Sequence, residues 1–142
     1  EKYTTNSEEG FMNKPWETEP SYKTWFDTRT GLRCAIIRRP YGHLCGYVRI
    51  PRKLRKKVLK RHHHPTFNIH GGITFYGKMD CVGRKESGYW IGFDCGHICD
   101  YLPFAPKYYN SGTESDYKTW KYVAREIKTL AFFLKLKLLT VV

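Results

Sequence analysis

The sequence predicts an α+β domain: a mainly antiparallel sheet of four or more strands with a long C-terminal helix packed on one face. Two observations lead to this class. Four segments rich in β-branched and aromatic residues follow one another between turns that contain glycine or proline. One segment near the C-terminus repeats its apolar residues at helical spacing. Strands in succession followed by one amphipathic helix are typical of the α+β class.

The N-terminal region differs in composition from the rest of the chain. The whole chain of 142 residues suits one domain. Residues 1–31 are polar, contain two prolines and include Trp16 and Trp25, which predicts an extended, partly disordered arm held to the domain by its rings. We therefore expect an arm over residues 1–31 and a single α+β domain over residues 32–142.

Four strands are expected from segment length and from the turns between the segments. They are Leu32–Arg39, His43–Ile50, Phe67–Tyr76 and Gly88–Cys95. Successive side chains of a strand point to opposite faces, so one apolar face should meet the helix. The other face holds polar residues, large rings, Gly72 and Gly92. Because glycine inside a strand costs stability unless something approaches the backbone, we expect a binding cleft on this face.

Two helical segments are expected. Pro51–Arg61 should form one or two turns anchored by Leu54 and Val58, which are four residues apart. A longer helix should begin at Ser115, whose hydroxyl can cap it. Its far end stays open, because Leu134–Leu138 alternates with period two and fits a short strand equally well.

The charge of the chain is strongly positive and unevenly distributed. The net charge is +12, and residues 31–142 hold 21 basic residues against seven acidic ones. Such a field attracts polyanions, so nucleic acid, nucleotides or an acidic protein surface are the expected partners. The alternative is a soluble basic protein with no such partner. No apolar run approaches the roughly 20 residues of a membrane-spanning helix, so we expect no membrane partner.

The densest positive charge lies between two of the predicted cleft strands. We expect this block to line the rim of the cleft and to contact phosphates; the alternative is a solvated surface loop. The adjacent histidines 62–64 fit a loop better than a metal site, since sequence neighbours seldom converge on one ion. The candidate residues for nucleic-acid or anion binding are Arg49, Arg52, Lys53, Arg55, Lys56, Lys57, Lys60, Arg61 and Trp90.

The predicted cleft also brings histidines and aspartates together. The candidate catalytic residues are His43, His70, Thr74, Asp94, His97 and Asp100. The candidate ligands of a divalent metal, which would activate water for attack on a phosphoester, are His70, Asp94, His97 and Asp100. Without a metal, His70 would be the general base, Asp94 would fix its tautomer and His97 would be the acid. Two alternatives remain: an anion-binding cleft without catalysis, and histidines and aspartates that only satisfy buried carbonyls and cap turns.

The five cysteines form no CxxC pair. Cys95, His97 and Cys99 alternate along an extended segment, so they would need a turn to grip one zinc ion. We expect reduced, buried thiols.

Three strings of the sequence carry a resemblance to a known group. They are GHLCGYV at Gly42–Val48, HGGITF at His70–Phe75, and YWIGFDCGH at Tyr89–His97 with Asp100 beyond it. From about Met12 onward the chain resembles small proteins encoded by bacteriophages and prophages. The resemblance implies a viral origin and a compact domain. The group has no established activity, so it implies no reaction.

Small accessory phage proteins often block bacterial defence, and this analogy, with the positive charge, suggests a function. We expect an inhibitor of the anti-CRISPR kind that binds a nucleic-acid-guided nuclease, its guide RNA or another anionic ligand in the bacterial cytosol. The expected partner is a host defence protein or ribonucleoprotein, or a nucleic acid or nucleotide. The alternative is a phosphodiesterase or nuclease that degrades RNA or a nucleotide signal in the His/Asp cleft, with a divalent metal as its candidate cofactor.

Overall fold

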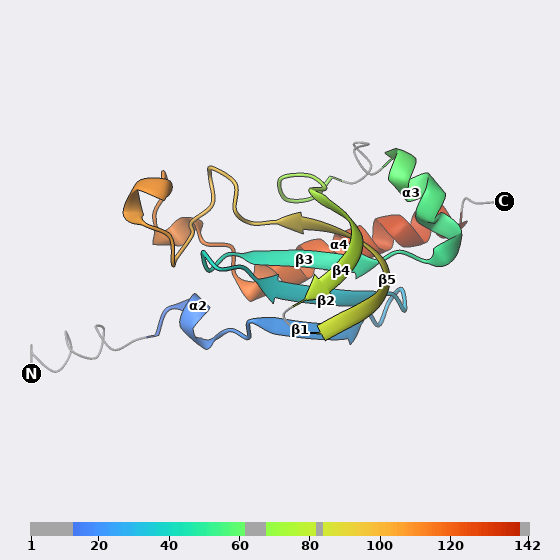
Figure 1. Ribbon diagram of the computed structural model, residues 1–142, viewed down its shortest axis with the longest axis horizontal. Helices are drawn as coiled ribbons and strands as arrows, with labels where there is room; N and C mark the ends of the chain where they lie inside the picture. Colours follow the sequence, from blue (N-terminus) through green and yellow to red (C-terminus); the bar gives the residue numbers. More distant parts are fainter. Residues whose placement is uncertain (1–12, 62–67, 82–83, 140–142) are drawn as a thin grey trace, which may run out of the picture.

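The fold is a five-stranded antiparallel sheet with one long helix across a face (Figure 1). The computed structural model describes residues 13–61, 68–81 and 84–139, and the statements below refer to these ranges. The predicted α+β class is confirmed. The expected disorder of residues 1–12 and the histidines at 62–64 lie outside the described residues.

The strand order in the sheet is β1-β2-β3-β5-β4. The strands are β1 Tyr22–Phe26, β2 Arg33–Arg38, β3 Leu44–Arg49, β4 Phe75–Cys81 and β5 Arg84–Asp94. The α-helices are α2 Pro15–Thr18, α3 Arg55–Arg61 and α4 Trp120–Leu139, and short 3-10 helices are η1 Arg52–Leu54, η2 Lys107–Tyr109 and η3 Glu114–Asp116.

The main core lies between the sheet and α4. It includes Val48 and Ile91 from the central strands and Ile127 from the helix, all almost completely buried. Gly46 allows this close packing, because a Cβ there would lie 2.6 Å from Phe93 Cζ and 2.8 Å from Ile127 Cγ1. As the apolar spacing predicted, Leu54 and Val58 anchor η1 and α3 to the same core.

The second face of the sheet is a second core, and the predicted cleft on this face is wrong. The β4–β5 hairpin curls over it, as Figure 1 shows in front of β2 and β3. Tyr47, Met79 and Trp90 are buried there. Gly92 leaves room for the Tyr47 ring, so this glycine serves internal packing. Alternation along a strand shows which residues share a face, but it does not distinguish a ligand from a covering hairpin.

The third predicted strand is displaced along the chain. β4 begins at Phe75, and the described residues before it form a loop. Gly71 and Gly72 both have left-handed backbone angles, with φ of 66° and 77°. Two such residues in succession turn the chain away from extended geometry, which is a role suited to glycine. The loop carries Ile69 and Ile73 into the main core but leaves Phe75 on the opposite face.

The predicted arm contributes the edge strand β1 and the short helix α2. Trp25 packs against Trp120 of α4, and the Trp16 ring lies 5.1 Å from the Tyr117 ring, so both rings hold this segment as expected. Glu19 adds polar contacts, because its carboxylate accepts hydrogen bonds from the Trp120 N–H and the Tyr117 hydroxyl.

The long helix starts later than predicted and includes the C-terminal segment whose structure the sequence left open. Thr113 and Asp116 form a capping box around η3, and Tyr117 is extended, so the chain from Ser115 does not enter the helix directly. α4 begins at Trp120 and runs to Leu139, which settles the ambiguous end as helix. No helix in the described ranges has the length and apolar character that crossing a bilayer requires.

Gly92→Ala should destabilise the protein by about 1–3 kcal/mol, the usual cost of overpacking a core. The new Cβ would meet the Tyr47 ring and lie 2.7 Å from the backbone oxygen of Gly46, which has little room to move. Urea denaturation would measure the loss. Thr74→Ala, at an exposed position of the neighbouring segment, is the control and should change little. Equal stability of the Gly92 variant and the wild type would contradict the second core.

Candidate functional site

The predicted functional residues separate into two groups at opposite ends of β3. His43 directly precedes this strand and Arg49 ends it. A strand rises about 3.3 Å per residue, so the two ends lie roughly 20 Å apart. Asp94 belongs to the His43 end, because it pairs with Cys45. The histidines and aspartates gather there, and the basic block gathers at the Arg49 end.

At the first end, His70 is the centre of a hydrogen-bond network. Its Nε2 lies 2.8 Å from Asp100 Oδ2, and its Nδ1 lies 2.8 Å from the Tyr122 hydroxyl. Its backbone N–H donates to Glu126 Oε1 at 2.9 Å. Both ring nitrogens are thus engaged, and the loop that carries His70 is fastened to α4.

Asp100 is the buried anion of this network. Its side chain is only 1% exposed, and it accepts the His97 backbone N–H at 3.0 Å. Lys118 Nζ lies 3.3 Å from its second oxygen. Burial alone would raise the pKa of Asp100, but the hydrogen bonds from His70, the His97 backbone and Lys118 outweigh burial and hold this pKa below its ordinary value.

Asp94, His97 and His43 lie beside this network. His97 Nε2 is 3.7 Å from Asp94 Oδ1, and their side chains are 35% and 30% exposed. The ring nitrogens His97 Nε2 and His43 Nδ1 are buried and make no hydrogen bond in the described structure. Burial lowers the pKa of His43, although nearby Asp94 opposes the shift.

The structure therefore brings together most of the predicted His/Asp residues, but with other roles. Asp100, rather than Asp94, orients His70. Thr74 is exposed and lies outside the hydrogen-bond network described above. Among the described residues, no three histidines, cysteines or acidic residues are arranged to hold a metal ion.

Three residues of the network were missed by the sequence analysis: Lys118, Tyr122 and Glu126. They recur every four residues, so they form one polar stripe at the start of α4 and just before it. This spacing was a usable signal. Burial and the neighbouring Glu126 raise the pKa of Tyr122 to about 12, so its hydroxyl keeps its proton at neutral pH.

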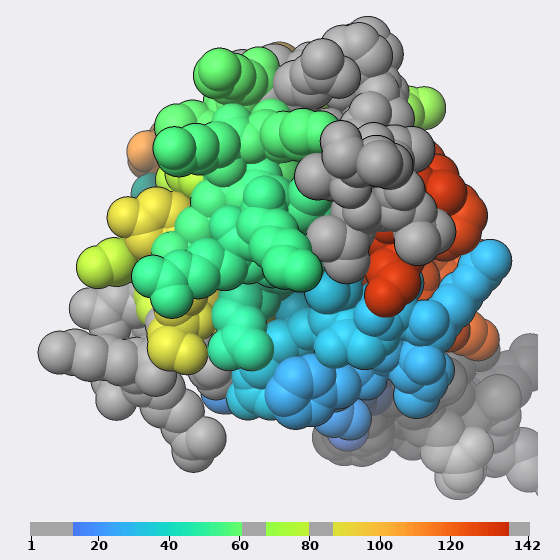
Figure 2. Space-filling view, turned by 90° about the vertical axis from the view of Figure 1, so that its right-hand side faces the viewer, coloured from blue at the N-terminus to red at the C-terminus, as the bar shows by residue number. Residues whose placement is uncertain are grey.

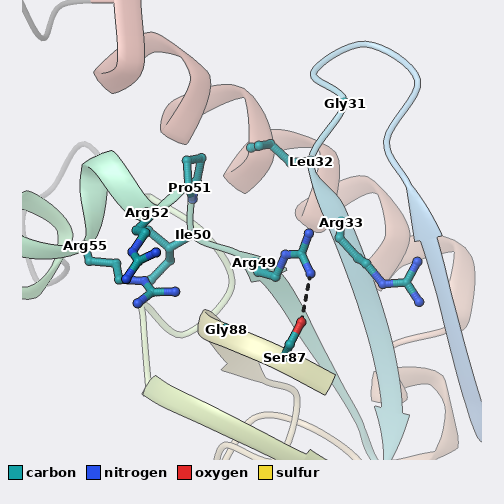
Figure 3. Close-up of a pocket in the computed structure, with 10 residues that line it drawn as sticks. All are labelled: Gly31, Leu32, Arg33, Arg49, Ile50, Pro51, Arg52, Arg55, Ser87 and Gly88. Carbon is teal, nitrogen blue, oxygen red and sulfur yellow. Dashed lines mark hydrogen bonds between the residues drawn. The ribbon is translucent and has the colours of Figure 1, made fainter. Parts of the chain in front are cut away.

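At the second end, a hollow of about 440 Å³ opens between three parts of the fold. Figure 2 looks onto this end, with α3 and η1 in green, the β1–β2 connection in blue and the start of β5 in yellow. Figure 3 shows the residues that line the hollow. They are Gly31, Leu32, Arg33, Arg49, Ile50, Pro51, Arg52, Arg55, Ser87 and Gly88, which we call the arginine pocket.

Two arginines of the pocket lie side by side over Gly88. A Cβ at this glycine would be 3.0 Å from Arg49 Cδ and 3.9 Å from Arg55 Nη2. Arg49 donates to Ser87 Oγ at 3.4 Å (Figure 3). Arg55 stacks on the Tyr89 ring, with its guanidinium carbon 4.8 Å from the ring centre. Gly88 has φ of 89°, so glycine suits this position by backbone angle as well as by space.

Among the residues that the structure describes, cations line the pocket and no carboxylate does. Arg52 adds a third guanidinium from η1, and Figure 3 shows it with Arg55 on one side of Arg49. Arg33 turns away toward β1, where it donates to Thr24 Oγ1 at 2.9 Å. No described carboxylate side chain pairs with Arg49, Arg52 or Arg55. Arg55 Nε is buried and has no hydrogen-bond partner in the described structure.

The remaining basic residues cover the outer side of η1 and α3. Those whose side chains the structure describes are exposed: Lys53, Lys56, Lys57 and Lys60. The side chain of Arg61 lies outside the described part. Trp90 is fully buried in the second core, so it cannot stack on a nucleic-acid base, and its prediction as a binding residue is wrong. Ser87 and Gly88 were not predicted, because only the curl of β5 brings them to Arg49.

The expectation of buried thiols is confirmed for three of the four cysteines whose side chains the structure describes. Cys34, Cys45 and Cys95 are free and buried, but Cys99 is free and exposed, so the expectation is wrong there. Burial raises the pKa of Cys34 to about 12, so this thiol stays protonated and unreactive at neutral pH.

No protein-family model, curated protein or solved structure matches the chain.

Asp100→Asn should lower the free energy of unfolding at pH 7 by about 1–3 kcal/mol, because a buried charged acceptor is removed. The lowered pKa of Asp100 stabilises the fold above the unfolded pKa of about 3.9, and this contribution disappears as the pH falls through the folded pKa. The variant should therefore lose less stability on acidification than the wild type. Urea denaturation from neutral pH down to about pH 3 measures both effects.

Glu17→Gln removes an exposed carboxylate from α2 and is the matched control. It should reproduce the acid dependence of the wild type. If Asp100→Asn reproduces it too, the assignment of the buried anion is wrong.

Proposed function

We propose that this protein binds the phosphate groups of nucleic acid through the arginine pocket and the exposed lysines of η1 and α3. The observation that supports this most directly is that Arg49, Arg52 and Arg55 line one hollow where no described carboxylate accompanies them. Guanidinium groups match phosphate oxygens with paired hydrogen bonds, which makes arginine suited to phosphate recognition.

The crowding of positive charge at this end has a physical cost. Arg49, Arg52 and Arg55 line the same hollow, and like charges gathered in one place repel. A bound anion reduces this repulsion. A purely structural arrangement would more often place a carboxylate among the arginines.

The surface continues beyond the pocket, and this favours an extended polyanion. The four described lysines of η1 and α3 are exposed beside the pocket. Each lysine or arginine that neutralises a phosphate releases a condensed counterion, so such a surface gains affinity at low salt without reading sequence. The net charge of +12 supports the same class of partner.

The more specific role expected from the sequence is an inhibitor of a nucleic-acid-guided nuclease. We retain it as part of the proposal, with guide RNA or the ribonucleoprotein as the partner. Such an inhibitor would bind the RNA through the same surface. This role requires a phosphate-binding surface on a small chain, and that chemical requirement is what the proposed surface meets.

A second candidate function is phosphodiester cleavage at the His70 end. It is favoured by two buried ring nitrogens without partners, His43 Nδ1 and His97 Nε2, since unsatisfied buried polar groups are rare in folded proteins. Asp94 lies beside His97 and can stabilise its protonated form. In this scheme His97 exchanges a proton with the reacting oxygen, and His70 serves to position the loop because both its nitrogens are engaged.

The triple variant Lys56→Gln, Lys57→Gln and Lys60→Gln should bind a labelled single-stranded RNA more weakly than the wild type. The slope of log affinity against log salt should fall by about one for each phosphate that the variant no longer neutralises. Fluorescence anisotropy over a series of salt concentrations measures both quantities.

The matched control is Lys107→Gln, Lys121→Gln and Lys128→Gln, which removes the same charge from exposed lysines on other elements. If the two triple variants weaken binding equally, binding depends on net charge alone and the proposed surface is wrong.

Incubation of the protein with labelled RNA, single-stranded DNA and cyclic nucleotides, with and without Mg²⁺ or Mn²⁺, tests the second candidate. Any cleavage should disappear in Asp94→Asn and His97→Gln, while RNA retention persists because the arginine pocket is untouched. Cleavage that survives in both variants, or no cleavage by the wild type, would reject the His70 end as a catalytic centre.

A further inference from the structure

The lining of the arginine pocket is chemically mixed. Arg49, Arg52 and Arg55 supply charged groups, and Leu32 and Pro51 supply apolar ones (Figure 3). Ile50 also borders the hollow but is buried in the main core. The hollow measures about 440 Å³. This volume falls in the range of about 300–1,000 Å³ that is typical of small-molecule sites, so it suits one nucleotide unit.

The concentration of charge fits a phosphate monoester better than a phosphodiester. A monoester carries about −1.5 to −2 at neutral pH and offers three terminal oxygens. A backbone diester carries one negative charge and two free oxygens. Three guanidinium groups around one hollow therefore match the oxygens and charge of a terminal phosphate, whereas single lysines suffice for backbone phosphates.

Two of the three guanidinium groups have contacts within the protein before any ligand binds. Arg55 lies against the Tyr89 ring, and its backbone oxygen accepts a hydrogen bond from the Tyr76 hydroxyl at 3.2 Å. Arg49 donates to Ser87 Oγ at 3.4 Å. Preorganised donors lose less conformational entropy on binding than free surface side chains do.

We propose that the arginine pocket binds the terminal phosphate of a nucleic-acid strand, with the first nucleoside against Leu32 and Pro51. This inference rests on the proposed function, because the lysines of α3 would hold the phosphates that follow. A free mononucleotide has the same monoester but cannot reach those lysines. The protein should therefore prefer a phosphorylated strand end over both a hydroxyl end and a mononucleotide.

The experiment compares short single-stranded RNAs of one sequence with phosphate or hydroxyl at the 5′ end, and then at the 3′ end. A hydroxyl-ended strand one nucleotide longer has an equal number of phosphates, so it differs from the phosphate-ended strand by a diester in place of the monoester. Fluorescence anisotropy with an internal label gives each dissociation constant, and unlabelled adenosine monophosphate serves as a competitor. A phosphate at one end should tighten binding about tenfold, since one or two charge-assisted hydrogen bonds account for that ratio.

The variants separate the pocket from the surface around it. Arg49→Gln combined with Arg55→Gln should abolish the preference for the phosphorylated end. Arg52→Gln, at an exposed position, should reduce it and serves as a second variant if the double variant is poorly folded. The control variant Lys53→Gln with Lys57→Gln removes the same charge as the double variant. It should bind both strands more weakly but keep the ratio of their dissociation constants. Circular dichroism and thermal melting confirm folding of each variant.

The outcomes distinguish this inference from the proposed function. A preference that depends on Arg49 and Arg55 supports the inference. Equal binding of phosphate-ended and hydroxyl-ended strands overturns it but leaves the proposed function intact. If adenosine monophosphate competes at the same concentration as a phosphate-ended strand, the proposal that the pocket binds strand ends is wrong. Failure of every RNA to bind overturns both.

Discussion

Burial of the central strand β3 on both faces is the constraint on which the rest of the structure depends. One face packs against α4 through Val48, and the other packs beneath the β4–β5 hairpin through Tyr47. Neither face is open to a ligand. The chemistry that β3 can offer is therefore confined to its two ends, where loops and short helices leave the sheet.

Glycine makes this double burial geometrically possible. Gly46 in β3 lets Phe93 and Ile127 approach on the helix side, and Gly92 in β5 accepts the Tyr47 ring on the other. A side chain at either position would separate the layers. The glycines of the central strands therefore bring the sheet close to both of its covers, and the curl of β5 that follows from this packing carries Ser87 and Gly88 to the arginine pocket.

Local patterns in the sequence predicted the features that depend on residues close together in the chain. Leu54 and Val58 predicted the helical turns after β3, and the His70, His97 and Asp100 group was expected to converge and does so. The predictions failed where a distant segment decides the outcome. Alternation could not show that the β4–β5 hairpin curls over Tyr47 and buries its own Trp90, and paired glycines at 71 and 72 ended the extended stretch that the apolar residues suggested. The pocket itself was missed because Arg49, Arg55 and Gly88 meet only through the fold.

The described carboxylates explain why the pocket retains its charge. Asp94 and Asp100 are engaged at the opposite end of β3, and Glu19 is occupied by the start of α4. Asp27, in the turn nearest the pocket, is buried and accepts both the Thr30 hydroxyl and its backbone N–H. None of these anions lines the hollow. Because these described carboxylates are committed to internal contacts, none of them neutralises the arginines that line the hollow. The hollow therefore keeps the positive charge on which the proposed phosphate binding depends.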